Sequence, residues 1–128
     1  MIVAGVGCRA GATAGEIEAA IAEALDRAGV AAAELAAIAT SQTKAAEPGI
    51  VAAASGRGVK LVAVAQAEFE AAGARTTTHS ERVLALTGVP SVAEAAALAA
   101  GGPSARLLAP RIAVGPATCA LAICGDAL

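Results

Sequence analysis

The chain has 128 residues, enough for one domain with a single hydrophobic core, and a formal net charge of −2 at pH 7. Hydrophobic residues make up 57% of it, but 40 residues are alanines, so the larger aliphatic side chains must fill most of the core. The sequence has no basic stripe and one aromatic residue, which argues against a nucleic-acid partner. The longest uncharged apolar run, residues 112–125, is 14 residues long, whereas a membrane-spanning helix needs roughly 18.

The N-terminal residues and the cysteine pattern together predict where in the cell the protein is found. Residues 1–4 include no basic residue of the kind that opens a signal peptide, so we expect no leader. Cys8, Cys119 and Cys124 form no Cys-x-x-Cys pair and no even disulfide framework. With His79 as the only histidine, we expect no zinc site, no other metal and no cofactor. The sequence therefore predicts a cytoplasmic protein that does not enter a membrane.

The first part of the chain alternates strand and helix signals. Residues 2–6 predict a short buried strand, and the glycines near its end predict a tight turn into a helix. Thr13 and Glu16 have the spacing of a capping box, in which each side chain satisfies a backbone N–H of the first turn. Apolar residues at four-residue spacing continue this helix to Gly29, a residue type that commonly follows a helix. Residues 35–40 predict a second strand, followed by a polar loop.

Capping and breaker residues organise the rest of the chain. Pro48 suits the first turn of a second helix, which Gly58 would end. Ser91 and Glu94 have the spacing of another capping box, and the glycines at 101 and 102 would stop the helix that it opens. Residues 73–79 predict an irregular loop. The other predicted helices are 66–71 and 80–87, and the other predicted strands are 59–64, 106–109 and 117–124.

Helices between successive strands imply crossover connections. This order predicts an α/β fold with a single three-layer domain over residues 1–128. We expect a mainly parallel sheet of about five strands, in which the last strands can pair antiparallel.

The glycine-rich loop near the N-terminus raises three alternatives, of which the first is a dinucleotide site. Gly5, Gly7 and Ala10 match the pattern Gly-x-Gly-x-x-Ala between a strand and a helix. The second strand, however, runs into residues 40–42 without the acidic residue that would hold a ribose hydroxyl. The chain is also too short for two mononucleotide-binding halves, and no Gly-Lys-Ser or Gly-Lys-Thr is present for a Walker phosphate loop.

The second alternative is a cysteine nucleophile. Cys8 precedes a helix N-terminus and adjoins Arg9, and both features would lower the pKa of its thiol. Such a nucleophile usually needs a positioned base, and His79 lies in a distant loop. The sequence favours a small, partly buried residue at a strand end. Cys119 and Cys124, at odd spacing on one strand, are predicted to pack on opposite sides of the sheet.

The third alternative, an anion site, accounts for more residues. Arg9 and the free N–H groups of the helix that begins at Thr13 offer a carboxylate or phosphate site. Lys44 and Glu47 follow the second strand, and Arg111 lies near the end of the chain. Ligands of wound α/β sheets bind at the carboxyl ends of strands, where these cations would meet a ligand with several carboxylates. The competing interpretation is that Lys44 and Arg111 are ordinary solvated charges.

Three separated motifs carry a resemblance to a known family. They are residues 5–11 with the Glu16 helix, the pair Lys44 and Glu47, and residues 88–98. In this order they resemble the C-terminal domain shared by the CobE and CbiG cobalamin biosynthesis proteins. The resemblance implies a role in building the corrin ring, with a precorrin-type tetrapyrrole as ligand. Multidomain CbiG proteins open a lactone and release a two-carbon fragment, whereas this chain looks like the stand-alone CobE form.

The resemblance and the charges together give a set of expected ligand-binding residues. These are Gly7, Cys8, Arg9, Gly11, Thr13, Lys44, Glu47, Ser91, Glu94 and Arg111. A binding or carrier module is the first hypothesis, with other cobalamin-pathway enzymes or a second copy of the chain as partners. A small hydrolase or isomerase that uses Cys8 or Glu47 is the alternative, and a purely structural subunit is the third. His79 receives no role from the resemblance.

Overall fold

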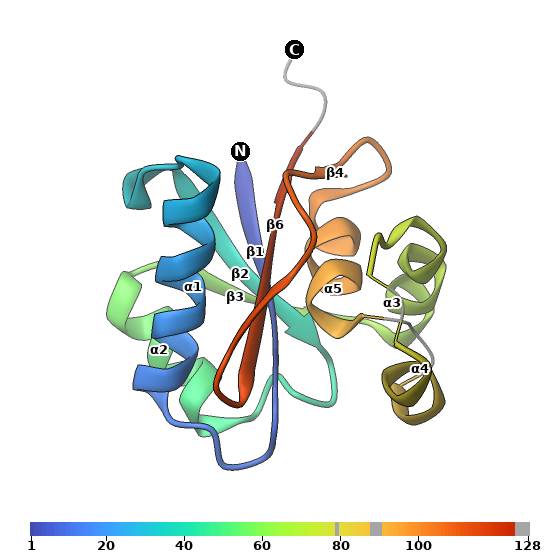
Figure 1. Ribbon diagram of the computed structural model, residues 1–128, viewed down its shortest axis with the longest axis horizontal. Coiled ribbons are helices and arrows are strands. Elements are labelled where there is room, and N and C mark those ends of the chain that lie inside the picture. The colour runs from blue at the N-terminus through green and yellow to red at the C-terminus, as the bar shows by residue number, and fades with distance from the viewer. Residues whose placement is uncertain (79, 88–90, 125–128) are drawn as a thin grey trace.

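In a computed structural model that describes residues 1–78, 80–87 and 91–124, a sheet of six strands lies between two layers of helices (Figure 1). The strands are β1 (Ile2–Cys8), β2 (Leu35–Ser41), β3 (Lys60–Val64), β4 (Arg106–Leu107), β5 (Ile112–Val114) and β6 (Ala117–Ile123). The α-helices are α1 (Ala14–Ala28), α2 (Pro48–Arg57), α3 (Gln66–Ala72), α4 (Glu81–Thr87) and α5 (Val92–Gly101). Two 3₁₀ turns, η1 (Ala32–Glu34) and η2 (Gly73–Arg75), complete them.

The sheet has a parallel and an antiparallel half. Its order is β3-β2-β1-β6-β4, with β5 paired to β6, and β1, β2 and β3 run parallel. The strand β6 runs antiparallel to β1, β4 and β5. The predicted α/β class and the antiparallel closing strands are therefore confirmed, but the sheet is mixed rather than mainly parallel. The sequence missed β5 because three residues beside a turn give too short a pattern to identify.

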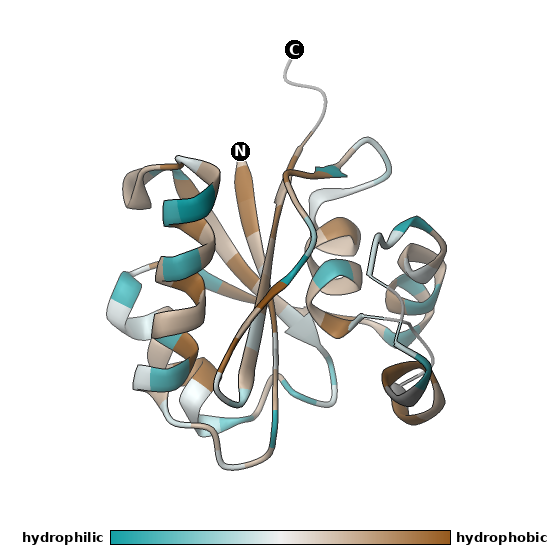
Figure 2. Ribbon diagram, viewed as in Figure 1, coloured by the Kyte–Doolittle hydropathy of each residue, from teal (hydrophilic) through white to brown (hydrophobic). Residues whose placement is uncertain are grey.

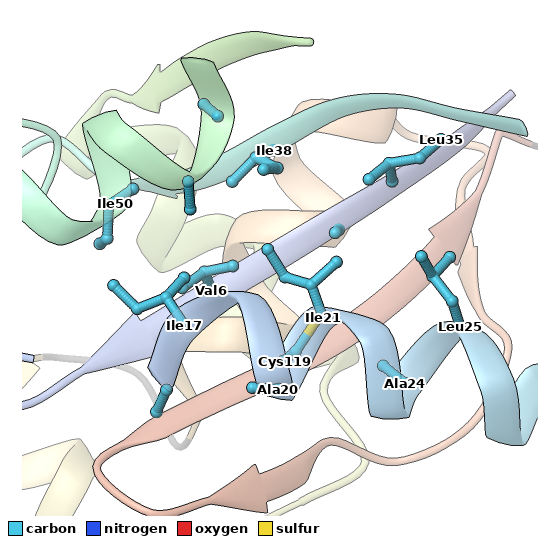
Figure 3. Close-up of a cluster of buried hydrophobic side chains, with 14 of the residues drawn as sticks. Val6, Ile17, Ala20, Ile21, Ala24, Leu25, Leu35, Ile38, Ile50 and Cys119 are labelled. Atoms are coloured by element: carbon cyan, nitrogen blue, oxygen red, sulfur yellow. The ribbon is translucent and has the colours of Figure 1, made fainter. Parts of the chain in front are cut away.

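The helices α1 and α2 cover one face of the sheet with aliphatic side chains. The predicted capping box is present: Thr13 N–H donates to Glu16 Oε1 over 2.9 Å, and Glu16 N–H donates to Thr13 Oγ1 over 3.1 Å. Gly29 ends α1 with a φ of 69°. Figure 3 shows Ile17 and Ile21 pointing from α1 toward the sheet, which presents side chains from β1, β2 and β6. Local sequence signals thus account for this layer.

The helix α5 lies against the other face, and α3 packs on α5 (Figure 1). Here the backbones approach closely: a Cβ on Gly5 would lie 1.9 Å from the carbonyl oxygen of Ala93, and one on Gly7 would lie 2.9 Å from Oγ1 of Thr118. Both glycines belong to β1, which extends two residues beyond the predicted strand end at Val6. The predicted turn therefore begins later than expected: Gly5 and Gly7 lie in β1 and make room for neighbouring elements, and it is Gly11 that adopts a positive φ of 84°.

The remaining boundaries follow the predictions closely. The helices α2 and α3 and the strand β6 begin and end within one residue of the predicted positions, and Cys119 and Cys124 pack on opposite sides of the sheet, as expected. His79 and Gly88, the residue after the predicted helix 80–87, lie outside the described residues. Within the described ranges, every helix is too short or too polar to cross a membrane.

Candidate functional site

A pocket of about 690 Å³ opens where the carboxyl ends of β1 and β2 meet the turn between β5 and β6. This volume lies inside the range of roughly 300–1,000 Å³ that is usual for small-molecule sites. Hydrogen bonds join the segments around it: Arg9 N–H donates to the Pro116 carbonyl, and Gln42 N–H donates to the Val64 carbonyl, both over 3.0 Å. A pocket therefore lies at the carboxyl ends of the strands, where the sequence predicted a ligand site.

Three cations line this pocket and are called the cationic wall. Arg9 follows β1, Lys44 lies in the loop after β2, and Arg111 directly precedes β5. In the part of the chain that the structure describes, carboxylates pair only with Arg27 and Arg57, which lie elsewhere. The three cations of the wall are thus available to an anionic ligand. The hydroxyl groups of Ser41, Thr43 and Thr118 lie among them.

A second group of lining side chains, the apolar wall, comes from the second helical layer. Phe69 of α3, Val83 and Leu86 of α4, and Val92 at the start of α5 line it. Phe69 is 1% exposed, whereas Leu86 is 75% exposed. Figure 2 shows α4 coloured largely as hydrophobic, although it lies outside the main core. A ligand in the pocket would therefore meet both cationic and hydrocarbon side chains.

Cys8 lies in this pocket at the end of β1, half-buried. Burial raises the pKa of its thiol above the ordinary value; the nearby Lys44 opposes the rise and Glu47 adds to it. The predicted lowering of the thiol pKa by Arg9 and a helix N-terminus is therefore not found. The side chain packs against the core under α1, which explains why desolvation dominates.

Gly11, Thr13 and Glu47 lie outside the lining of the pocket and hold the loop between β1 and α1. Glu47 Oε1 accepts a hydrogen bond from the Gly11 N–H over 2.7 Å, where Gly11 has a φ of 84°. The capping box of Thr13 already satisfies N–H groups of the first turn of α1. Two of the N–H groups at the N-terminus of α1 are thus taken by its own sequence, and the anion site expected there stays a prediction.

Ser91 and Glu94 also lie outside the pocket lining. The Ser91 hydroxyl accepts from the Glu94 N–H over 3.3 Å, as predicted for a helix cap. The Glu94 carboxylate is 0% exposed and binds other segments: it accepts from the Thr77, Thr78 and Arg111 N–H groups and from the Thr78 hydroxyl. Burial alone would raise the pKa of Glu94, but these four hydrogen bonds together lower it.

The structure thus divides the predicted site residues into two groups. Gly7, Cys8, Arg9, Lys44 and Arg111 meet in the pocket. The other five lie around it and shape its loops, and ligand contact by any of the ten stays a prediction. Sequence reasoning missed the apolar wall, although Phe69, the only phenylalanine, follows a strand end and could have signalled it.

Comparison with known proteins identifies the class to which this fold and pocket belong. Residues 2–122 match the family described as cobalamin synthesis G C-terminus. The chain belongs to this family of CobE and CbiG cobalamin biosynthesis proteins, so the resemblance that the sequence indicated is confirmed.

Individual relatives agree with this assignment. Protein CobE of Sinorhizobium sp is 40% identical over 121 residues, covering 94% of this chain and 79% of that protein. The crystal structure of CobE, a protein from the cobalamin biosynthetic pathway, superposes with a TM-score of 0.89 at 35% identity, covering 95% of this chain and 89% of the other. Cobalamin biosynthesis protein chiG from Agrobacterium tumefaciens str. C58 superposes with a TM-score of 0.79 at 46% identity, covering 98% and 100%.

Proposed function

We propose that this protein binds a precorrin-type tetrapyrrole in the pocket at the carboxyl ends of β1 and β2. The observation that carries the proposal is the pairing of two unlike walls around about 690 Å³ of space. Three cations without a described ion-pair partner form one wall, and apolar side chains from three helices form the other. Family membership supplies the pathway, and the pocket supplies the chemistry of recognition.

Precorrins are flat macrocycles edged by acetate and propionate groups. Arg9, Lys44 and Arg111 would pair with carboxylates at one edge of the ring, and the two guanidinium groups can do so bidentately. Phe69 and Val92 would lie against the hydrocarbon of the macrocycle, as apolar walls do in most ligand sites. Burial of Leu86 by the ligand would remove an exposed leucine from water, which favours binding.

The pocket supports binding or carriage better than hydrolysis. Burial raises the pKa of the Cys8 thiol, so the thiolate needed for attack is less available at neutral pH than on an unperturbed cysteine. Glu47, the other candidate catalytic residue, already accepts a hydrogen bond from the Gly11 N–H and does not line the pocket. A carrier of this kind would hand its tetrapyrrole to another enzyme of the pathway.

A binding titration tests the proposal. A precorrin fraction from a cobalamin-producing host is titrated into purified protein and followed by visible absorbance, a range in which amino-acid side chains do not absorb. We expect Arg9→Ala/Lys44→Ala to weaken binding by at least about tenfold, since each cation should contribute on the order of 1 kcal/mol. The matched control is Lys60→Ala/Arg106→Ala, which removes two exposed cations outside the pocket. Equal loss of affinity in both double variants, or in neither, would sink the proposal.

The enzyme alternative has its own test. The Cys8 thiol should react with a disulfide reagent more slowly than a free thiol at neutral pH, because its pKa is raised. Cys8→Ser should also restore cobalamin synthesis in a strain that lacks the gene. Rapid reaction of Cys8 together with failed complementation would instead establish a cysteine enzyme.

A further inference from the structure

Glu94 is a buried carboxylate with an unusual set of partners. It lies in the first turn of the alanine-rich helix α5, and its side chain is 0% exposed. A charged group without water is costly unless hydrogen bonds replace its hydration. The hydrophobic residues that surround it in α5 provide none, so the donors must come from elsewhere in the chain.

Those donors come from two segments far apart in the sequence. Glu94 Oε1 accepts from the N–H groups of Thr77 and Thr78 over 2.7 and 2.8 Å. Glu94 Oε2 accepts from the Thr78 hydroxyl over 2.6 Å and from the Arg111 N–H over 2.8 Å. Each oxygen therefore has two donors, and Oε2 alone joins the two segments.

Both segments lead directly into the pocket. The segment that contains Thr77 and Thr78 precedes α4, whose Val83 and Leu86 form part of the apolar wall. Arg111 itself belongs to the cationic wall, and Ala113 of β5 lines the pocket two residues later. Glu94 is therefore bonded to a segment of each wall without lining the cavity.

We propose that Glu94 is a positioning residue, which holds the α4 segment and the Arg111 segment at the separation that the ligand requires. The inference rests on the proposed function for the identity of the ligand. The hydrogen bonds of Glu94 to Thr77, Thr78 and Arg111, in contrast, are a property of the free protein. It predicts that the contacts of Glu94 affect tetrapyrrole affinity through the placement of Arg111 and α4, and not through contact with the ligand.

The substitution Glu94→Gln should keep the hydrogen bonds to the Thr77 and Thr78 segment and remove the one to Arg111. An amide has one oxygen and one NH₂ group, so it can accept on one side only. With the oxygen in the place of Oε1, the two threonine N–H groups keep their acceptor and the Thr78 hydroxyl can turn to accept from the NH₂ group. The Arg111 N–H then faces a donor and loses its partner. We therefore expect this variant to fold and to release the Arg111 segment selectively.

Amide hydrogen exchange in the free protein tests, without a ligand, whether Glu94 holds the two segments. In Glu94→Gln the Arg111 amide should exchange at least about tenfold faster than in the wild type, whereas the Thr77 and Thr78 amides change much less. The control is Ile21→Val, which weakens the core on the opposite face and should speed exchange generally rather than at Arg111. Unchanged exchange at Arg111, or uniform acceleration at all amides, would overturn the positioning role.

Titration with the precorrin fraction then tests the consequence for binding. Glu94→Gln should bind at least about tenfold more weakly than the wild type, and Ile21→Val should bind equally well. If the wild type binds and Glu94→Gln binds equally tightly, the positioning role is wrong and the proposed function stands. If the wild type does not bind, the proposed function fails, and hydrogen exchange at Arg111 still shows whether Glu94 holds the Arg111 segment.

Discussion

The two faces of the sheet are built by different physical means. Under α1 and α2, branched side chains such as Ile17, Ile21 and Ile50 fill the space between helix and sheet (Figure 3). Under α5, alanines of the helix lie against glycines of β1, and the close approach of backbones replaces large side chains. The first face provides an ordinary core, whereas the second carries charged side chains that connect the helix to the pocket loops. The difference shows that the α5 side of the molecule depends on tertiary contacts.

Substitution of Gly5 should cause the largest loss of stability on the α5 face. Gly5→Ala would put a Cβ 1.9 Å from the Ala93 carbonyl oxygen and 2.6 Å from the Ala97 nitrogen. Because backbone atoms cannot turn aside, the free energy of unfolding should fall by more than about 3 kcal/mol, above the usual cost of overpacking. Gly15→Ala is the control, since its Cβ would meet nothing closer than 3.9 Å and should change stability little. Chemical denaturation of both variants measures the difference, and similar losses would show that α5 is not tightly packed.

Alkaline pH should weaken the α1 face through Cys119. Burial raises the pKa of this thiol from 9.0 to about 12, against a smaller opposing effect of Arg57. The unfolded chain therefore loses this proton first, so the stabilisation is complete below pH 9 and is lost as pH rises toward 12. The loss should be about 2 kcal/mol near pH 10.5. Denaturation curves of Cys119→Ala should show a shallower slope than the wild type, since only the raised pKa of Cys8 still contributes, and those of Cys124→Ala should keep the full slope. An undiminished slope without Cys119 would refute the assignment.

A smaller effect is expected at the C-terminal end of α5. The Arg75 guanidinium donates to the carbonyl group of Leu98 in the last turn of α5 and to those of Gly102, Pro103 and Ala105 in the loop that follows, over 3.1–3.4 Å. Arg75→Ala should lower the unfolding free energy by about 1–2 kcal/mol.

Arg27→Ala is the matched control for this prediction. It removes an exposed ion pair with Glu23 within α1, which should contribute about 0.5 kcal/mol or less. Thermal unfolding of the two variants compares them directly. Equal stability of the two would mean that Arg75 does not hold the end of α5.

Acidic pH should act on the α5 face through Glu94. Four hydrogen bonds hold the pKa of this carboxyl below its ordinary value of 4.5, despite its burial. The stabilisation is therefore present above pH 4.5 and is lost as pH falls through the lowered pKa of the folded state. Acid titration of stability should be shallower in Glu94→Gln than in the wild type. An identical acid slope in the two proteins would mean that the Glu94 hydrogen bonds do not favour the charged form.

The sequence predicts those parts of the molecule whose causes are local. Thr13 and Glu16 lie three residues apart and cap α1 as their spacing indicates, and Gly29 ends it. The same holds for Arg9 and Lys44, which follow predicted strand ends and meet in the pocket. Adjacency along a parallel pair of strands was enough to bring these cations together.

Long-range contacts explain what the sequence could not give. Gly5 lies in the predicted strand, but its close contact with α5, almost ninety residues away along the chain, could not be predicted from its neighbours. Glu94 has the spacing of a capping box, but its carboxylate is taken by Thr77, Thr78 and Arg111. Nothing in the residues around Arg75 indicates that it would cap a distant helix. These side chains acquire their roles only when the second helical layer is assembled.

The most direct test of the central claim maps the ligand on the protein. Amide chemical shifts are recorded by NMR while the precorrin fraction is added to the wild-type chain. We expect the largest changes at Gly7, Lys44 and Gly115, which line the pocket, and little change at Gly29 and Gly58, which end α1 and α2 outside it. Changes centred on Gly29 and Gly58, or no change at any ligand concentration, would contradict the account.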